Sequence, residues 1–148
     1  MKARRCGWIL VAALAAGCDS PLDTDPTDAI DSDNALGTAR GIELALTGAY
    51  RSFQSTSLYN RNLIVHPDLY ADNLDFTGTF QTDRAFSLRN VPANNGDVTG
   101  FWQRSYDGIN RVNNVLAAIP KVTGLSEAQI SLYRGEALFI RGLHYHSL

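Results

Sequence analysis

The side chain with the most distinctive chemistry in this sequence is the thiol of Cys18, in the stretch LAAGCDS. It follows an apolar run over residues 8–16, and basic residues at positions 2, 4 and 5 precede that run. The run is well short of the roughly 20 apolar residues that span a bilayer. A positive start, a short apolar run and small residues before a cleavage point are features of a secretory signal peptide. We therefore expect residues 1–17 to be removed from the mature protein.

The residues directly before Cys18 indicate which kind of signal peptide this is. The stretch LAAG resembles the bacterial lipobox, in which the following cysteine is acylated and becomes the first residue, although Ala15 stands where leucine is commonest. The other cysteine, Cys6, lies in the segment to be removed, so the mature chain can form no internal disulfide. Because several acyl chains hold a protein on a membrane far more firmly than one, we expect Cys18 to be a lasting lipid anchor.

Residues 18–33 are expected to form a flexible acidic linker, since they contain six aspartates, two prolines and no basic residue. A calcium loop of the form D-x-[DN]-x-[DN]-G would need a glycine, and this stretch has none. Loss of the three basic residues of the leader takes the formal net charge from −2 to −5. No basic face typical of nucleic-acid-binding proteins remains.

Residues 56–97 hold the best candidates for ligand binding. This stretch mixes asparagine, aspartate, glycine and proline with aromatic residues and has no long period, which predicts mostly loop with a short helix near residues 58–65. Such long loops are often functional. Sugars present flat C–H faces to aromatic rings and hydroxyls to polar side chains, so carbohydrate capture fits this composition. The candidate binding residues are Tyr70, Asp72, Asn73, Asp75, Phe76 and Arg84, with Tyr59, Phe80 and Phe86 as further aromatics. For any one aromatic, local packing is the competing interpretation.

The histidines do not suggest a metal site. His144 and His146 are two residues apart, which on a helix turns them about 200° from each other, so one metal cannot take both. His66, before Pro67, stands alone in the sequence.

The acidic residues offer a weaker alternative. Asp68, Asp72 and Asp75 would share a face if they lay on one helix, as a cation site or a carboxylate pair, but no helix is secure there. No Ser-His-Asp arrangement carries a nucleophile elbow. We therefore expect no catalytic residue, no metal and no cofactor.

The elements that must position these residues are helices. Apolar side chains recur every three or four residues from residue 35 to residue 53, which predicts one helix of about five turns. Ser32 or Asp33 can cap its start. Three glycines weaken this helix, so we expect close packing against a neighbour to compensate. The apolar stripe consists of Ala35, Leu36, Ala39, Ile42, Leu46, Ala49, Tyr50 and Phe53.

Two longer helices follow. The first must stop before Pro120, and the second begins at a capping box made by Ser126 and Gln129. Because the link between them is short, they should form an antiparallel αα-hairpin, and the fold class is all-α. The inward-facing residues are expected to be Phe101, Trp102, Ser105, Ile109, Val112, Leu116 and Ile119 on the first helix, then Ile130, Tyr133, Ala137, Ile140 and Leu143 on the second.

Polar residues on these two helices should find partners, since partly buried polar groups are almost always paired. Glu136 and Arg141 lie five residues apart and do not face each other, so we expect each to pair across helices, Glu136 with Arg111. Asn113 and Asn114 should bond backbone or neighbouring polar groups.

The two helices also resemble a known family. FWQRSYDGINRVNNVLAAIP followed by GEALFIRGLHYHSL is similar to the N-terminal region of the SusD/RagB family, whose helices read W-x3-Y-x2-I-x3-N-x2-L and G-E-A-x-F-x-R-A-x2-Y-x2-L. ALTGAYRSF, residues 45–53, resembles the family's first helix, and Gly142 stands where the family has alanine. The matching positions are Trp102, Tyr106, Ile109, Asn113, Leu116, Gly135, Glu136, Ala137, Phe139, Arg141, Tyr145 and Leu148.

This resemblance implies an outer-membrane lipoprotein that binds nutrients, usually glycans, and delivers them to a SusC-type TonB-dependent transporter without catalysis. The acidic stretch after Cys18 also resembles the surface-export signal of Bacteroidetes-type lipoproteins. The implied fold is an α-superhelix of tetratricopeptide-like helical pairs, with residues 34–148 as its N-terminal part. Because family members are several times longer and this sequence stops inside a helix at Leu148, we expect the domain to be incomplete. The competing hypothesis is a helical interaction module with no small-molecule site.

Overall fold

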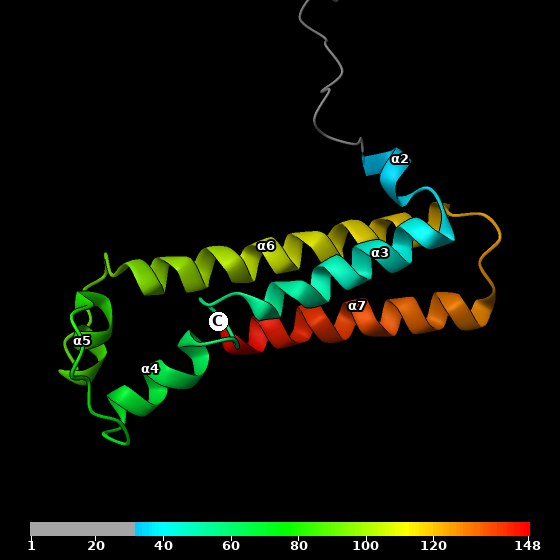
Figure 1. Ribbon diagram of the computed structural model, residues 1–148. Coiled ribbons are helices and arrows are strands. Elements are labelled where there is room, and N and C mark those ends of the chain that lie inside the picture. The colour runs from blue at the N-terminus through cyan, green and yellow to red at the C-terminus, as the bar shows by residue number, and fades with distance from the viewer. Residues whose placement is uncertain (1–31) are drawn as a thin grey trace, which may run out of the picture. The chain divides into compact units, whose positions relative to one another are not determined.

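The computed structural model describes residues 32–148, and every regular element in this part of the chain is helical (Figure 1). The predicted all-α class is therefore confirmed. The predicted leader, the Cys18 anchor and nearly all of the acidic linker lie outside the described residues. The elements are α2 (Ser32–Leu36), α3 (Ala39–Tyr50), the 3-10 turn η1 (Arg51–Gln54), α4 (Asn62–Tyr70), α5 (Gln81–Ser87), α6 (Gly96–Ala118), the 3-10 turn η2 (Ile119–Lys121) and α7 (Glu127–Ser147). Over residues 32–148, no helix combines the length and the apolar character needed to cross a membrane.

Three helices, α3, α6 and α7, pack together and form the hydrophobic core (Figure 1). The helices α6 and α7 run antiparallel, which confirms the predicted hairpin, and α3 packs against both. Because burying an aliphatic side chain contributes roughly 1.5–3 kcal/mol, this contact is the main source of stability among the described helices. Its central buried residues are Ile42, Leu46 and Ala49 from α3, Val112, Val115 and Ala118 from α6, and Tyr133, Ala137 and Ile140 from α7.

The ends of the hairpin helices follow the sequence closely. The predicted capping box is confirmed: Ser126 Oγ accepts a hydrogen bond from the Gln129 amide at 3.3 Å, and Gln129 Oε1 accepts one from the Ser126 amide at 3.0 Å. Helix α6 ends at Ala118, before Pro120, as predicted. In the link between the helices, Gly124 has a φ of 85°, a left-handed conformation that glycine adopts without strain.

The prediction of one continuous helix, capped at Ser32 or Asp33 and reaching residue 53, is wrong. The segment is divided into α2, α3 and η1, with the first break at residues 37–38. Thr38, and not Ser32 or Asp33, caps α3, because its Oγ1 accepts a hydrogen bond from the Gly41 amide at 3.0 Å. A Cβ at Gly41 would collide with the carbonyl of Ala35, so this glycine is what allows α2 to approach the start of α3.

The apolar face of α6 differs from the predicted stripe at one end. Trp102, expected to face inward, is 55% exposed, and its ring lies beside that of Tyr106, with ring centroids 5.0 Å apart. The prediction for Ile109 and Val112 is confirmed, as both are buried. With 23 residues, α6 is nearly twice as long as α3, which has 12, so its first turns project beyond the three-helix contact.

A glycine on α6 and a histidine on α7 interlock within the core. The imidazole of His144 is fully buried and stacks on the Phe53 ring with centroids 4.4 Å apart. A Cβ at Gly108 would collide with this imidazole, so the hairpin closes only because residue 108 has no side chain. His144 therefore takes an inward position next to Leu143, which is only half-buried.

One predicted cross-helix ion pair is wrong. Arg111 does not pair with Glu136, because its Nη1 donates a hydrogen bond to the carbonyl of Gly48 on α3 at 3.2 Å. Asn113 does have a polar neighbour, as predicted, since its Oδ1 accepts a hydrogen bond from Arg141 Nη1 at 3.0 Å.

The predicted loop between residues 56 and 97 contains more helix than expected. Instead of a helix near residues 58–65, α4 begins at Asn62 and continues past Pro67 to Tyr70, and a second helix, α5, was not predicted. Helix α5 has only seven residues, too few to show an apolar period in the sequence.

Candidate functional site

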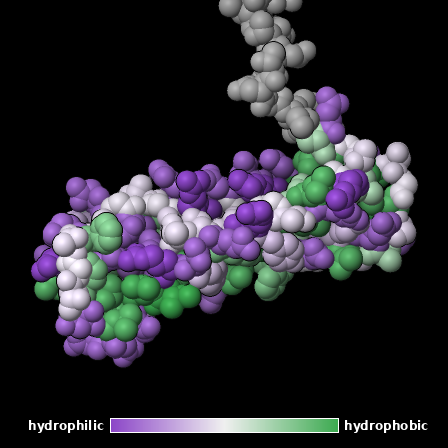
Figure 2. Space-filling view, in the orientation of Figure 1, coloured by the Kyte–Doolittle hydropathy of each residue, from purple (hydrophilic) through white to green (hydrophobic). Residues whose placement is uncertain are grey.

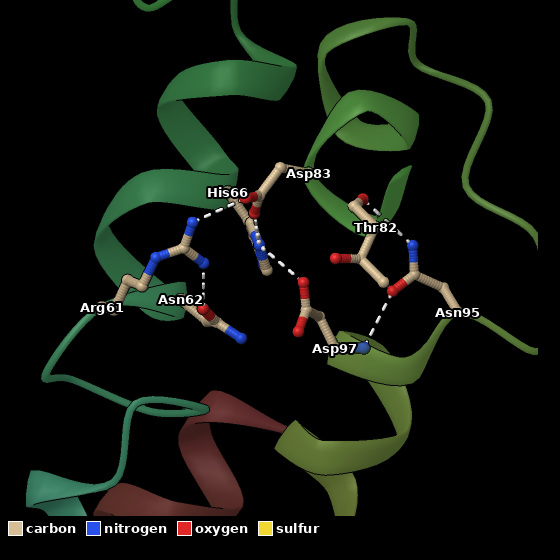
Figure 3. A network of polar contacts seen from close by, with 7 residues as sticks. All are labelled: Arg61, Asn62, His66, Thr82, Asp83, Asn95 and Asp97. Carbon is tan, nitrogen blue, oxygen red and sulfur yellow. Dashed lines mark hydrogen bonds and ion pairs between the residues drawn. The ribbon is translucent and has the colours of Figure 1, made fainter. Parts of the chain in front are cut away.

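A network of charged side chains joins α4, α5 and the first turn of α6 (Figure 3). At its centre lies Asp83 on α5, which is only 1% exposed. Asp83 Oδ2 accepts a hydrogen bond from Arg61 Nη2 at 2.6 Å, and its Oδ1 lies 3.0 Å from His66 Nε2. His66 Nε2 is also 3.4 Å from Asp97 Oδ2 on α6. One buried histidine thus connects carboxylates from two other helices.

The charges in this network stabilise one another. Burial by itself would raise the pKa of Asp83, but hydrogen bonds from Arg61 and His66 outweigh that effect, so the pKa lies below its ordinary value. The same bond to Asp83 raises the pKa of Arg61. Asp83 is therefore ionised across the physiological pH range and holds Arg61 and His66 in place.

The backbone start of α6 fixes the position of Asp97. Asn95 caps this helix: its Oδ1 accepts a hydrogen bond from the Asp97 amide at 2.9 Å, while its Nδ2 donates to the carbonyl of Thr82 at 3.2 Å (Figure 3). Asn95 is buried, so a single side chain joins the start of α6 to α5. A carboxylate in the first turn is also favoured by the helix dipole.

Next to the network lies an apolar cavity of about 330 Å³ between α4, α5 and α6. Its polar groups gather at the network, where His66 and Asp97 form part of the wall, and the His66 ring stacks on Phe86 with centroids 4.0 Å apart. Figure 2 shows hydrophobic surface at this end of the molecule, below a polar upper face. The cavity is lined by Ser57, Asn62, Leu63, His66, Pro67, Tyr70, Phe86, Asp97, Val98 and Phe101. An apolar wall with a few polar groups at one side is typical of small-molecule pockets, which measure about 300–1,000 Å³.

The predicted ligand-binding residues are divided by the structure. Tyr70 lies in the cavity wall and is 51% exposed, and Phe86 lines the same cavity. The others lie outside the cavity, in the segment around α5. They are Asp72, Asn73, Asp75, Phe76 and Arg84.

Three of these outer residues are engaged in local contacts. Asp72 pairs with Arg89 at 2.7 Å, the Asn73 amide group donates to Asp68 Oδ1 at 3.2 Å, and Arg84 donates to the carbonyl of Gly78 at 3.4 Å. These contacts shape the connection between α4 and α5. They are exposed, so a ligand could exchange for them at small cost.

The alternative of an acidic cluster on one helical face is wrong. Asp68 lies in α4, but Asp72 has a φ of 68°, past the end of that helix, and Asp75 follows in the connection to α5. The three carboxylates therefore do not share a helical face.

A different group has the composition of a metal site. His66, Asp83 and Asp97 can each offer one ligand atom, and these atoms lie within 4.8 Å of one another. Each carboxylate oxygen of Asp83 already accepts a hydrogen bond, one from Arg61 and one from His66. The contacts of these three side chains show a structural role, because they join α4, α5 and α6.

The role of His66, which stands alone in the sequence, was not predicted. Its partners stand 17 and 31 positions further along the chain and belong to helices that start after irregular segments. One signal was present: the Asn-Gly-Asp at residues 95–97 has the N-cap asparagine and early acid of a helix start. That signal would have placed Asp97 at the beginning of α6.

The core contains a second histidine contact that superficially resembles a catalytic pair. Ser52 Oγ lies 2.8 Å from His144 Nε2 and 2.6 Å from the carbonyl of Ala49. His144 is fully buried, and within residues 32–148 its Nδ1 has no hydrogen-bond partner, so no acid in this part of the chain orients the ring as catalysis would require. This contact is structural.

Comparison with known proteins gives one informative similarity. The whole chain aligns with "SusD-like protein P2" of Formosa agariphila, at 23% identity over 150 residues. The chain spans 29% of the length of that relative. No protein-family model matches the sequence, and no solved structure matches it.

Proposed function

We propose that this protein is a cell-surface lipoprotein of the SusD type that captures glycans or oligosaccharides for a SusC-type TonB-dependent transporter of the outer membrane. The observation that carries the proposal is the alignment of the whole chain with a SusD-like protein. The all-helical fold and the antiparallel α6–α7 hairpin support it, because both fit the helical pairs that the resemblance implies.

The cavity beside α4 is the proposed place of capture. Aromatic side chains of Tyr70, Phe86 and Phe101 line it, and His66 and Asp97 offer polar atoms at one side. A sugar ring has the matching combination of apolar faces and hydroxyl edges. At about 330 Å³ the cavity suits one terminal sugar unit, with the rest of a chain passing over Asp72, Asn73, Asp75, Phe76 and Arg84. The protein has no catalytic role in this proposal.

The binding experiment uses the full chain with oligosaccharides on an array, followed by calorimetry. We expect Tyr70→Ala to weaken binding roughly two- to tenfold, because one aromatic stacking contact is worth about 0.5–1.5 kcal/mol. Tyr145→Ala is the matched control, because Tyr145 is 53% exposed on α7 and lines none of the described cavities. Unchanged affinity in Tyr70→Ala would remove the cavity from the proposal.

The lipid anchor has its own test. Growth with a radiolabelled or alkyne-tagged fatty acid should label the protein, and Cys18→Ser should abolish the label and release the protein from the membrane fraction. Cys6→Ser is the control and should leave labelling intact, since we expect residues 1–17 to be removed. Labelling of the Cys18→Ser variant would contradict the anchor.

A helical interaction module is the second candidate. It is favoured by the large exposed side chains on the hairpin helices, since exposed aromatics are enriched at protein interfaces. The most exposed aromatic side chains on these helices are Phe139 at 59%, Trp102 at 55% and Tyr145 at 53%. Absence of binding to every saccharide, together with transporter capture that depends on Trp102, would establish this candidate instead.

A further inference from the structure

A second cavity, of about 510 Å³, lies between the end of α3, the η1 turn and α6. In contrast to the apolar cavity beside α4, nearly all of its side chains are polar. It is lined by Gly48, Arg51, Ser52, Gln54, Ser55, Thr56, Arg104, Asp107 and Arg111, and we call it the arginine groove. It shares no lining residue with the apolar cavity.

The helices bring three cations to this groove. On α6, Arg104, Asp107 and Arg111 follow one another at steps of three and four residues, so they lie along one face of the helix. Arg51 reaches the groove from the other wall, as the first residue of η1. The bend where α3 gives way to η1 therefore sets one guanidinium opposite two others.

These guanidinium groups are only partly satisfied by the protein. Arg104 Nη1 is 3.2 Å from Asp107 Oδ2, but both side chains are more than half exposed, and such surface pairs are weak. Arg111 donates one hydrogen bond, to the Gly48 carbonyl. Within residues 32–148, no hydrogen bond or ion pair of the Arg51 side chain is present.

The charge balance of the groove is unusual for this chain. Three arginines face a single carboxylate, which leaves two positive charges in excess on a protein whose formal net charge is −2. Each guanidinium has five N–H donors in a planar fork that matches the oxygens of a carboxylate or a sulfate ester. The hydroxyls of Ser55 and Thr56 line the same groove and could bond further oxygens.

We propose that the arginine groove binds an anionic group, a carboxylate or a sulfate ester, on the saccharide that this protein captures. The inference rests on the proposed function and deepens it, because it names the class of ligand as acidic saccharides. Neutral sugars would need only the apolar cavity. An acidic saccharide also gains from Arg51, whose charge has no acceptor within the described part of the protein.

The test measures affinity by calorimetry on the full chain with four probes: a short sulfated galactan, an oligogalacturonate and a neutral galacto-oligosaccharide of equal length, and inorganic sulfate. The variant is Arg51→Gln, which removes a charge that has no hydrogen bond or ion pair within residues 32–148 and so should fold normally. The control is Arg134→Gln, an exposed arginine of α7 outside the groove. Each titration is repeated at higher salt.

We expect the acidic probes to bind more tightly than the neutral one, with an affinity that falls as salt rises. Arg51→Gln should weaken the acidic probe about tenfold, and Arg134→Gln should leave it unchanged, because hydrogen bonds to charged groups are the stronger kind. The difference in affinity between the sulfated and the carboxylated probe shows which anion the groove prefers.

Other outcomes would overturn one proposal or both. Equal binding of an acidic probe by the native protein and Arg51→Gln, or a preference for the neutral probe, would overturn the groove while leaving glycan capture intact. No binding of any saccharide would overturn the proposed function, and the groove would survive only as an anion site if inorganic sulfate still bound through Arg51.

Discussion

The three-helix core and the α4–α5 end of the molecule are held together by different forces. In the core, buried aliphatic residues of α3, α6 and α7 pack against one another, and no single residue dominates. At the α4–α5 end, the contacts converge on one buried carboxylate, Asp83, which joins Arg61 and His66. Apolar packing is spread over many side chains, whereas the polar network depends on one. A single substitution should therefore destabilise the α4–α5 end locally, whereas a substitution in the core should affect its packed helices together.

The largest expected effect comes from Asp83→Asn. This change removes the charge that Arg61 and His66 share, and breaking a buried ion pair costs about 3 kcal/mol when one partner remains partly exposed, as Arg61 does. Hydrogen exchange should show that amides of α4 and α5 lose protection while those of α7 keep it. Asp107→Asn, in an exposed pair, is the control and should change the free energy of unfolding by less than about 1 kcal/mol. Retained protection in α4 and α5 would show that the network does not hold this end together.

The second largest loss of stability is expected from Gly108→Ala, in the three-helix core. The added methyl group would collide with the His144 ring, and overpacking of this kind costs about 1–3 kcal/mol. Denaturant unfolding should show the loss, and protection should fall across α6 and α7 together. In the control, Gly142→Ala, the new Cβ meets open space, so the variant should gain up to about 1 kcal/mol from helix propensity. Equal stability of the two variants would contradict the interlock between Gly108 and His144.

A smaller effect is expected at the start of α7. Ser126→Ala removes one half of the capping box and should lower the free energy of unfolding by about 1 kcal/mol. Ser131→Ala, at an exposed position within the same helix, is the matched control and should be neutral or slightly stabilising. If both variants unfold at the same denaturant concentration, the cap contributes nothing to the core.

The smallest effect is a pH dependence that separates the two regions. Burial lowers the pKa of His144, so the unfolded chain binds a proton more readily than the folded one. The stability contributed by neutral His144 is complete above the unfolded pKa of about 6.5 and declines as pH falls through and below it. From pH 7 to pH 6 the loss is at most about 0.7 kcal/mol.

Asp83 acts in a lower pH window, because its pKa is lowered in the folded state. Its stabilising effect is complete above the unfolded pKa of about 3.9 and is lost as pH falls below that value.

The His144 prediction is tested by measuring the free energy of unfolding at pH 7 and at pH 6. The difference between the two values should be smaller for His144→Gln than for the native protein, whereas His146→Gln, at an exposed position, should keep the native difference. A native difference that survives in His144→Gln would assign the pH dependence to another group.

The three-helix core could largely be predicted from the sequence, and the contacts at the α4–α5 end could not. The greater part of the α6 and α7 stripes, the capping box at Ser126 and the stop before Pro120 were correct, because periodicity, caps and proline act within a few residues. The helix break before α3 was missed because α2 is itself helical, so the apolar period continued through a change of direction. Trp102 fits the period, but it belongs to the first turns of α6, which project beyond the contact with α3 and α7, and it is 55% exposed.

By itself the sequence determined the all-α class, the hairpin and the resemblance that supports glycan capture, since each depends on local pattern or on a motif. Only the tertiary structure brought His66 to Asp83 and Asp97, and Arg51 to Arg104 and Arg111. These groups come from elements separated by turns and irregular segments, whose directions depend on packing across the whole domain. Both candidate binding sites therefore became visible only when the helices were placed in space.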